Sequence, residues 1–189
     1  MPVQSDVLRF WLEEVGPEGW YVADPEIDGA ITARFGTLWE EVRGGAHEIW
    51  GESAEGALAY LIAADQFPRN MFRGRPEAFA TDDLARQMAR RAVVAGQDLT
   101  VKEPERVFFY MPFEHSESLA DQDWSVALLE ARIGPLSNYA LHARAHREVI
   151  RRFGRFPFRN VALSRGSTPE EEVFLTQGGY GAIVRELGG

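Results

Sequence analysis

The chain has 189 residues, no cysteine, 45% hydrophobic residues, 26% charged residues and a net charge of −9. This length and composition are typical of a globular protein with a single core, so we expect one domain over residues 1–189. Without cysteine the chain forms no disulfide and has no thiolate nucleophile, and its negative charge argues against general affinity for nucleic acid.

Helical periodicity dominates the first half of the chain. Four helices are predicted there, each running from a capping residue to a glycine or proline, over residues 5–16, 24–44, 53–67 and 81–96. The third should stop at Phe67, because Pro68 disfavours helical geometry in the residue before it. The hydroxyl of Thr81 should cap the fourth.

Helical signals continue through the second half. Residues 103–132 have a break near Met111 and Pro112, and a longer helix follows from Pro135 to Phe153, where Gly154 suits a left-handed cap. A threonine, a proline and a glutamate then start a last helix in the sequence STPEEEVFL. Since no alternating strand pair is found, we predict an all-α fold, a compact array of helical hairpins with about seven to nine helices.

The sequence DQFPRNMFRGR places polar and basic residues around a proline at a predicted helix end. In one interpretation Asp65 pairs with an arginine and Asn70 satisfies backbone groups of the turn. In the other, several guanidinium groups on a rigid turn bind a carboxylate or a phosphate. The candidate ligand-binding residues are Asp65, Gln66, Arg69, Asn70 and Arg73.

Three titratable residues, Glu114, His115 and Glu117, follow an apolar segment. A histidine beside carboxylates is a candidate for acid–base catalysis when it lines a cleft. Downstream, His142 and His146 have the i, i+4 spacing that can place two imidazoles on one metal ion, but a packed or hydrogen-bonded His146 is the favoured interpretation. The catalytic candidates are therefore His115, Glu117 and His146, and no metal is predicted.

A second basic motif, RRFGRFPFRN, lies at the end of the same helix. Between Arg144 and Arg165 there are seven arginines and one acidic residue, a local charge of +6 in an acidic protein. Arg155, Arg159 and Asn160 therefore join the candidate ligand-binding residues. Signatures of phosphate-binding loops, dinucleotide-binding folds and serine nucleophile elbows are lacking, so no cofactor is predicted.

These motifs resemble the bacterial family called domain of unknown function 924. The resemblance rests on DQFPRNMFRG, MPFEHSES, HREVIRRFGRFPFRN and STPEE, in this order, and extends over nearly the whole chain. It implies a single all-helical domain related in fold to tetratricopeptide-repeat proteins, and it implies no reaction. The family pattern matches Asp65, Gln66, Phe67, Pro68, Arg69, Asn70, Arg73, His115, Glu117, His146, Arg155, Pro157, Arg159 and Asn160.

One position departs from the family pattern. The family's usual tail reads Phe-Pro-His-Arg-Asn, whereas Phe158 occupies the histidine position here. If that histidine acts as a base or a metal ligand in relatives, this chain lacks it. Otherwise the position is structural.

Three functions fit these motifs. In the first, which we favour, the protein binds a small anionic molecule or a peptide carboxylate in a pocket lined by arginine, histidine and acidic residues. In the second, it is a hydrolase or lyase that activates water with His115 or His146. In the third, the motifs form a buried polar network that has no ligand.

The partners follow from the same features. We expect a small anionic molecule or a peptide as ligand, and the sequence is compatible with a homodimer. The first residues lack a basic segment followed by an apolar run, and no run of about 18 apolar residues occurs. We therefore expect a cytoplasmic protein with neither a membrane nor nucleic acid as partner.

Overall fold

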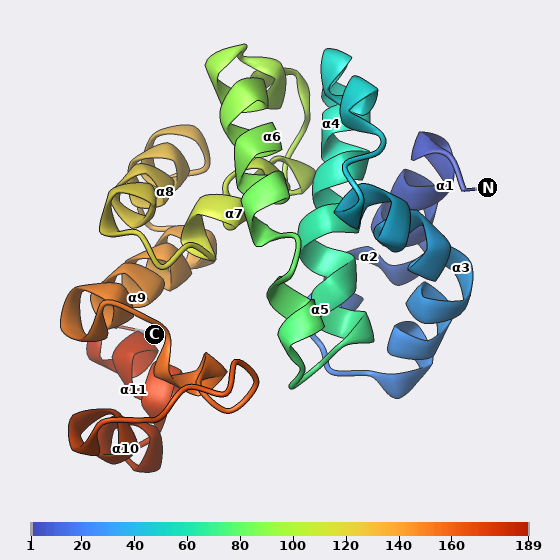
Figure 1. Ribbon diagram of the computed structural model, residues 1–189. Coiled ribbons are helices and arrows are strands. Elements are labelled where there is room, and N and C mark those ends of the chain that lie inside the picture. The colour runs from blue at the N-terminus through green and yellow to red at the C-terminus, as the bar shows by residue number, and fades with distance from the viewer. Residues whose placement is uncertain (1, 189) are drawn as a thin grey trace. The chain divides into compact units, whose positions relative to one another are not determined.

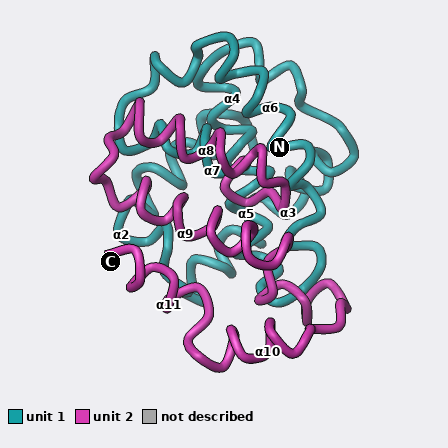
Figure 2. Tube along the Cα trace, turned by 90° about the vertical axis from the view of Figure 1, so that its left-hand side faces the viewer, with its two compact units in different colours: residues 1–112 teal, residues 113–189 magenta. Residues whose placement is uncertain are grey.

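The structure is a computed structural model that describes residues 2–188 (Figure 1). Within these residues every regular element is helical and no strand is present, which confirms the all-α prediction. The chain divides into two compact units, residues 1–112 and residues 113–189 (Figure 2). One domain over residues 1–189 stays a prediction, and so does the relation to tetratricopeptide-repeat proteins.

The first unit contains six α-helices in its described residues, joined by short 3₁₀ and π-helical turns. Two of them begin at a side-chain cap: the Asp24 carboxylate accepts a hydrogen bond of 2.8 Å from the backbone of Glu26 at the start of the longest helix, and the Ser53 hydroxyl accepts one of 3.1 Å from the backbone of Gly56 at the start of another. The helices are α1 (Gln4–Leu8), α2 (Gly16–Gly19), α3 (Pro25–Arg43), α4 (Ala54–Leu61), α5 (Phe67–Met71) and α6 (Asp82–Val94).

Aromatic side chains fill the core of the first unit. The Phe67 side chain is fully buried, and its ring centroid lies 4.8 Å from that of Phe35, 5.7 Å from Trp11 and 6.1 Å from Phe10. The indole N–H of Trp20 donates a 2.7 Å hydrogen bond to the backbone carbonyl of Trp11. The start of α5 is therefore anchored in the core of this unit by a large apolar side chain.

The expected helix end at Phe67 is wrong. A π-helical turn, Ile62–Gln66, follows α4 and runs directly into α5, where Pro68 lies in the first turn. A proline is tolerated there because the N–H groups of a first turn have no partner in the helix. The π-helical turn is what lets the chain continue past a proline that would otherwise end the helix.

Thr81 helps to accommodate this proline. Ala64, four residues before Pro68, would accept a hydrogen bond from position 68 in a regular α-helix. Its carbonyl instead accepts a 2.5 Å hydrogen bond from the Thr81 hydroxyl, which also accepts one of 3.2 Å from the indole of Trp39. The side chain of Thr81 therefore makes no capping bond to α6, contrary to the expectation, although it occupies the capping position.

The second unit has α9 as its central helix. Helix α9 packs against α8 and α11, and α10 packs against α11. The core of the second unit combines Ala145, Val149 and Ile150 with Phe156, Phe174 and Ile183. The helices are α7 (Met111–Glu114), which spans the boundary between the units, α8 (Leu119–Arg132), α9 (Asn138–Phe153), α10 (Pro169–Thr176) and α11 (Gly179–Glu186).

Two predicted helix boundaries in the second unit are confirmed, whereas the helix expected from Pro135 begins at Asn138, where Ser137 provides the cap. Gly154 adopts a φ of +67° and its N–H bonds to the carbonyl of Ile150, as a left-handed cap requires. Thr168 and Glu171 form the predicted capping box at the start of α10. Of the described helices, none combines the length and the apolar character needed to cross a membrane.

We expect Phe67→Ala to lower the free energy of unfolding by about 3–5 kcal/mol, because the substitution leaves a cavity among rings that cannot collapse to fill it. Urea unfolding followed by circular dichroism measures the change. Phe158→Ala is the matched control, since the Phe158 side chain is 44% exposed. An equal decrease in the free energy of unfolding in the two variants would contradict the central place of Phe67 in the core.

Candidate functional site

The motif around Pro68 satisfies its own backbone. The Arg69 guanidinium donates a 2.6 Å hydrogen bond to the carbonyl of Asp65, and the Asn70 amide donates one of 3.0 Å to the carbonyl of Gln66. Together with the bond from Thr81, these contacts serve three successive carbonyls, those of residues 64–66. Buried carbonyls need such partners, so the polar residues of the motif have a structural task.

The arginines of this motif pair with carboxylates. Arg69 lies 3.1 Å from the buried carboxylate of Asp65 and 2.9 Å from that of Asp82. Arg73 binds both oxygens of Asp28, at 2.6 and 2.9 Å, and bonds to the side-chain oxygen of Asn70 at 2.7 Å. Gln66 completes the group with a 2.6 Å bond to Asp65. An anionic ligand would therefore have to compete with carboxylates that are already in place.

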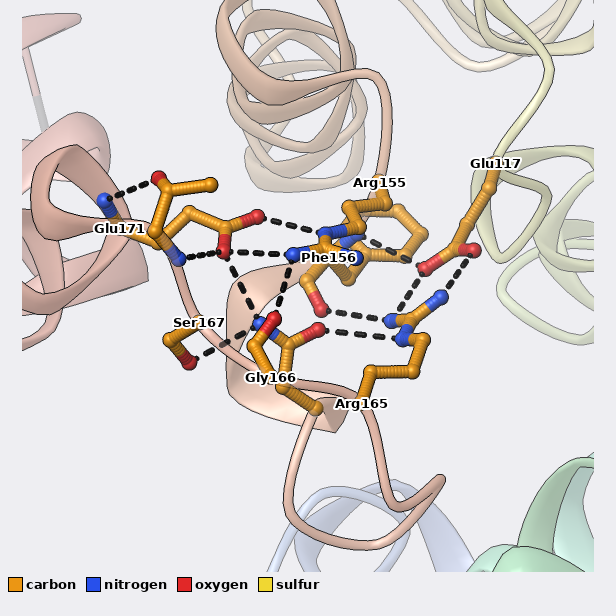
Figure 3. Close-up of polar contacts among 9 residues, drawn as sticks. Glu117, Arg155, Phe156, Arg165, Gly166, Ser167 and Glu171 are labelled. Atoms are coloured by element: carbon orange, nitrogen blue, oxygen red, sulfur yellow. Dashed lines mark hydrogen bonds and ion pairs between the residues drawn. The ribbon is translucent and has the colours of Figure 1, made fainter.

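The second basic motif forms a similar network (Figure 3). Arg155 binds both oxygens of Glu171, at 2.6 and 2.8 Å, and the amide of Asn160 donates to one of them at 3.2 Å. Arg165 binds both oxygens of Glu117, at 2.7 and 2.9 Å. The bidentate geometry is the strongest form of this ion pair.

Glu117 and Glu171 tie separate segments to this network. Glu117 also accepts a 2.8 Å bond from the backbone N–H of Phe156, and Glu171 is the glutamate of the capping box of α10. The hydrogen bonds from Arg155 and from the Thr168 backbone lower the pKa of the Glu171 carboxyl to about 2, although burial opposes the change. Burial would raise the pKa of Glu117, but the bonds from Arg165 and Phe156 outweigh it and lower the pKa. Both carboxylates are thus ionised structural partners.

Arg159 of the second basic motif is buried. Its side chain is 7% exposed, and its guanidinium lies 4.5 Å from the ring centroid of Phe156. Arg69 and Arg73 belong to the first unit, whereas Arg155 and Arg159 belong to the second. That the four converge on one ligand stays a prediction.

A different cluster gathers around His146 in the second unit. Its Nδ1 lies 2.8 Å from the carboxylate of Glu114, which is 7% exposed. Tyr180 of α11 places its hydroxyl 3.2 Å from the same Nδ1 and 2.5 Å from Nδ1 of His142. The ring of His115 lies 6.2 Å from that of His146, centroid to centroid. The structure thus brings two sequence candidates, His115 and His146, into one group.

The members of this cluster perturb one another. Burial would raise the pKa of Glu114, but the charge of His146 and its hydrogen bond lower it. Burial lowers the pKa of His142, with a smaller opposing effect of Glu114. Burial and the negative charge of Glu114 raise the pKa of Tyr180. Around neutral pH the cluster therefore holds an ionised carboxylate, a neutral His142 and a protonated phenol, the kind of grouping that serves proton transfer.

Sequence reasoning missed several members of these groups. Tyr180 follows two glycines on a short terminal helix and carries no motif, so no local signal could have identified it. Glu114 was recognised as titratable but not as the partner of His146, because their pairing joins residues 32 positions apart. Among the described residues no three histidine, aspartate or glutamate side chains are arranged to bind a metal ion.

The structure thus defines an all-helical protein in which Arg69, Arg73 and Arg155 pair with carboxylates and in which three of the four histidines, His115, His142 and His146, lie in one cluster. The chain belongs to the bacterial protein family of unknown function DUF924, whose sequence model matches residues 7–179.

The chain is also similar to a solved structure, the protein of unknown function ATU0120 from Agrobacterium tumefaciens. The two sequences are 41% identical, the match covers 93% of this chain and 97% of the other, and the TM-score is 0.87. A search of curated proteins found no match.

We expect Arg69→Gln to destabilise the protein by about 3–5 kcal/mol, because it leaves the buried Asp65 carboxylate without its cation. Arg75→Gln is the control: the Arg75 side chain is 62% exposed in its pair with Glu77, and such pairs contribute less than about 1 kcal/mol. Urea unfolding of both variants checks the difference. A loss below about 1 kcal/mol in Arg69→Gln would show that the arginine is not part of the structural network.

The pKa of Glu171 predicts a pH dependence. Because this pKa is about 2 in the folded chain and 4.5 ordinarily, the ionised carboxylate stabilises the fold above about pH 4.5, and that stabilisation disappears as the pH falls towards 2. The difference in unfolding free energy between wild type and Glu171→Gln should therefore be largest at neutral pH and should become smaller in acid. Urea unfolding at several pH values measures it, with the exposed neighbour Glu170→Gln as control. A gap that is unchanged between pH 7 and pH 3 would contradict the prediction.

Proposed function

We propose that the protein is an acid–base enzyme, a hydrolase or lyase that activates water with His146. The observation that carries the proposal is the 2.8 Å contact between His146 Nδ1 and the buried Glu114 carboxylate. A carboxylate that accepts a hydrogen bond from one ring nitrogen orients the imidazole, and the other nitrogen of the neutral ring can then accept a proton from a reactant. The carboxylate also balances the charge of the imidazolium that forms.

The outer nitrogen of His146 supports this role. Within residues 2–188 all hydrogen bonds of the His146 side chain are made by Nδ1, and none by Nε2. The side chain is 17% exposed, so a water molecule can reach it. No serine or threonine hydroxyl of the described residues bonds to His146, which favours activation of water over a covalent intermediate.

The reaction would proceed by two proton transfers. Nε2 of His146 takes a proton from water as the water oxygen bonds to the electrophilic atom of the substrate. The imidazolium that forms is balanced by Glu114 and returns the proton to the leaving group. Each of these steps uses only the imidazole, the carboxylate and water.

Binding of a small anionic molecule or a peptide carboxylate, which the sequence favours, has weaker support. Arg69, Arg73 and Arg155 each pair with a carboxylate of the protein. These pairs support a structural role for the two arginine motifs. We also propose that the protein acts in the cytoplasm.

We expect wild-type protein to hydrolyse members of a panel of chromogenic esters, amides and lactones. His146→Gln and Glu114→Gln should lower kcat by at least about 100-fold, because the first removes the base and the second removes the carboxylate that orients it. His47→Gln is the control, since His47 pairs with Glu41 in the first unit and lies outside the cluster. Turnover that survives His146→Gln within a factor of two would overturn the proposal.

A further inference from the structure

Tyr180 links the two histidines of α9 through a single hydroxyl. Its oxygen lies 2.5 Å from Nδ1 of His142 and 3.2 Å from Nδ1 of His146. The rings confirm the close packing: Tyr180 stacks on His142 with centroids 5.8 Å apart, and its centroid lies 4.6 Å from that of His146. A phenol has one hydrogen to donate, so the two imidazoles cannot both receive it.

The partners of His146 decide where its hydrogen lies. Besides the tyrosine oxygen, its Nδ1 faces the Glu114 carboxylate at 2.8 Å and the backbone carbonyl of His142 at 3.0 Å. An ionised carboxylate and a carbonyl can only accept hydrogen bonds. His146 therefore carries a hydrogen on Nδ1, and in the neutral ring its Nε2 has a free lone pair.

His142 must then have the opposite arrangement. Since Nδ1 of His146 already carries a hydrogen, the Tyr180 hydroxyl cannot donate to it and donates to the nearer acceptor, Nδ1 of His142. The other oxygen in reach, the carbonyl of His142, is 3.4 Å away. A neutral His142 that accepts at Nδ1 carries its hydrogen on Nε2.

We infer that Tyr180 holds His142 as a hydrogen-bond donor beside the basic His146, so that the site takes an uncharged carbonyl compound, an ester or an amide. This inference rests on the proposed function. His146 removes a proton from water, the water oxygen bonds to the carbonyl carbon, and the π electrons move to the carbonyl oxygen. The Nε2–H of His142 donates to that oxygen as negative charge develops on it.

The charges of the cluster favour the same substrate class. Glu114 is its ionised member, and burial keeps His142 neutral by lowering its pKa. An anionic substrate would meet the Glu114 carboxylate there, whereas an uncharged carbonyl compound meets a base and a donor. The two histidines lie four residues apart on α9, about 6 Å along the helix axis, so both can face the same side of the helix.

The test is the tautomer of each histidine, measured by long-range ¹H–¹⁵N correlation spectra of uniformly labelled protein near pH 7.5. We expect the hydrogen of His146 on Nδ1 and that of His142 on Nε2. His47 provides an internal reference, because its Nε2 lies 2.8 Å from the Glu41 carboxylate and carries a hydrogen. A neutral His142 with its hydrogen on Nδ1 overturns the inference.

Tyr180→Phe removes only the hydroxyl. It should leave the His146 tautomer unchanged, because Glu114 remains, while His142 becomes a mixture of tautomers. A folded Tyr180→Phe protein in which His142 is still wholly Nε2-protonated overturns the inference, and the wild-type spectrum tests it even if this variant does not fold.

Activity measurements separate this inference from the proposed function. For an ester substrate, His142→Phe should lower kcat by about 100-fold while KM changes little, since it removes the donor to the developing oxyanion. If His146 is required for turnover but His142→Phe is fully active, the role of His142 is wrong and the proposed function stands. If the tautomers are as expected but no ester or amide is hydrolysed, the arrangement of hydrogens stands and the proposed reaction fails.

Discussion

Burying a polar group is costly unless it is paired, and this constraint explains most of the residues that make the sequence of this protein distinctive. The carbonyls around Pro68 are the clearest example. A side chain from each of Thr81, Arg69 and Asn70 serves one of three successive carbonyls, and the carboxylates of Asp65 and Asp82 then neutralise the half-buried Arg69 guanidinium. Each contact creates the need for the next, because a hydrogen-bond donor that carries a charge must itself be paired when it is buried.

The helices were predictable from sequence because their determinants are local. Asp24, Gly154, and the threonine before α10 with the glutamate of its first turn act through bonds within four residues, which a reader of the sequence can count. The helix end at Phe67 was mispredicted because the effect of Pro68 depends on the π-helical turn before it and on Thr81, which is 13 residues downstream. Local rules give the cost of a proline but not the distant hydroxyl that offsets it.

The candidate site was less predictable for the same reason. The arginines were identified from their pattern, but their carboxylate partners lie as far away as Asp28 for Arg73 and Glu117 for Arg165, at separations of 45 and 48 residues. The pattern alone could not distinguish an arginine that binds a ligand from one that forms an ion pair with a carboxylate of the protein. His115 and His146 were both named as catalytic candidates, and their rings lie 6.2 Å apart, whereas Tyr180 has no sequence signal and only the packing of α11 on α9 reveals it.

The bond between Thr81 and the carbonyl of Ala64 also has a consequence for how this sequence can change. With proline at position 68, the carbonyl depends on the threonine hydroxyl. With any other residue there, a backbone N–H could serve it, and the hydroxyl would matter less. The cost of losing the hydroxyl therefore depends on which residue occupies position 68. The two positions should consequently show epistasis, and relatives that lack the proline should be those in which position 81 is free to vary.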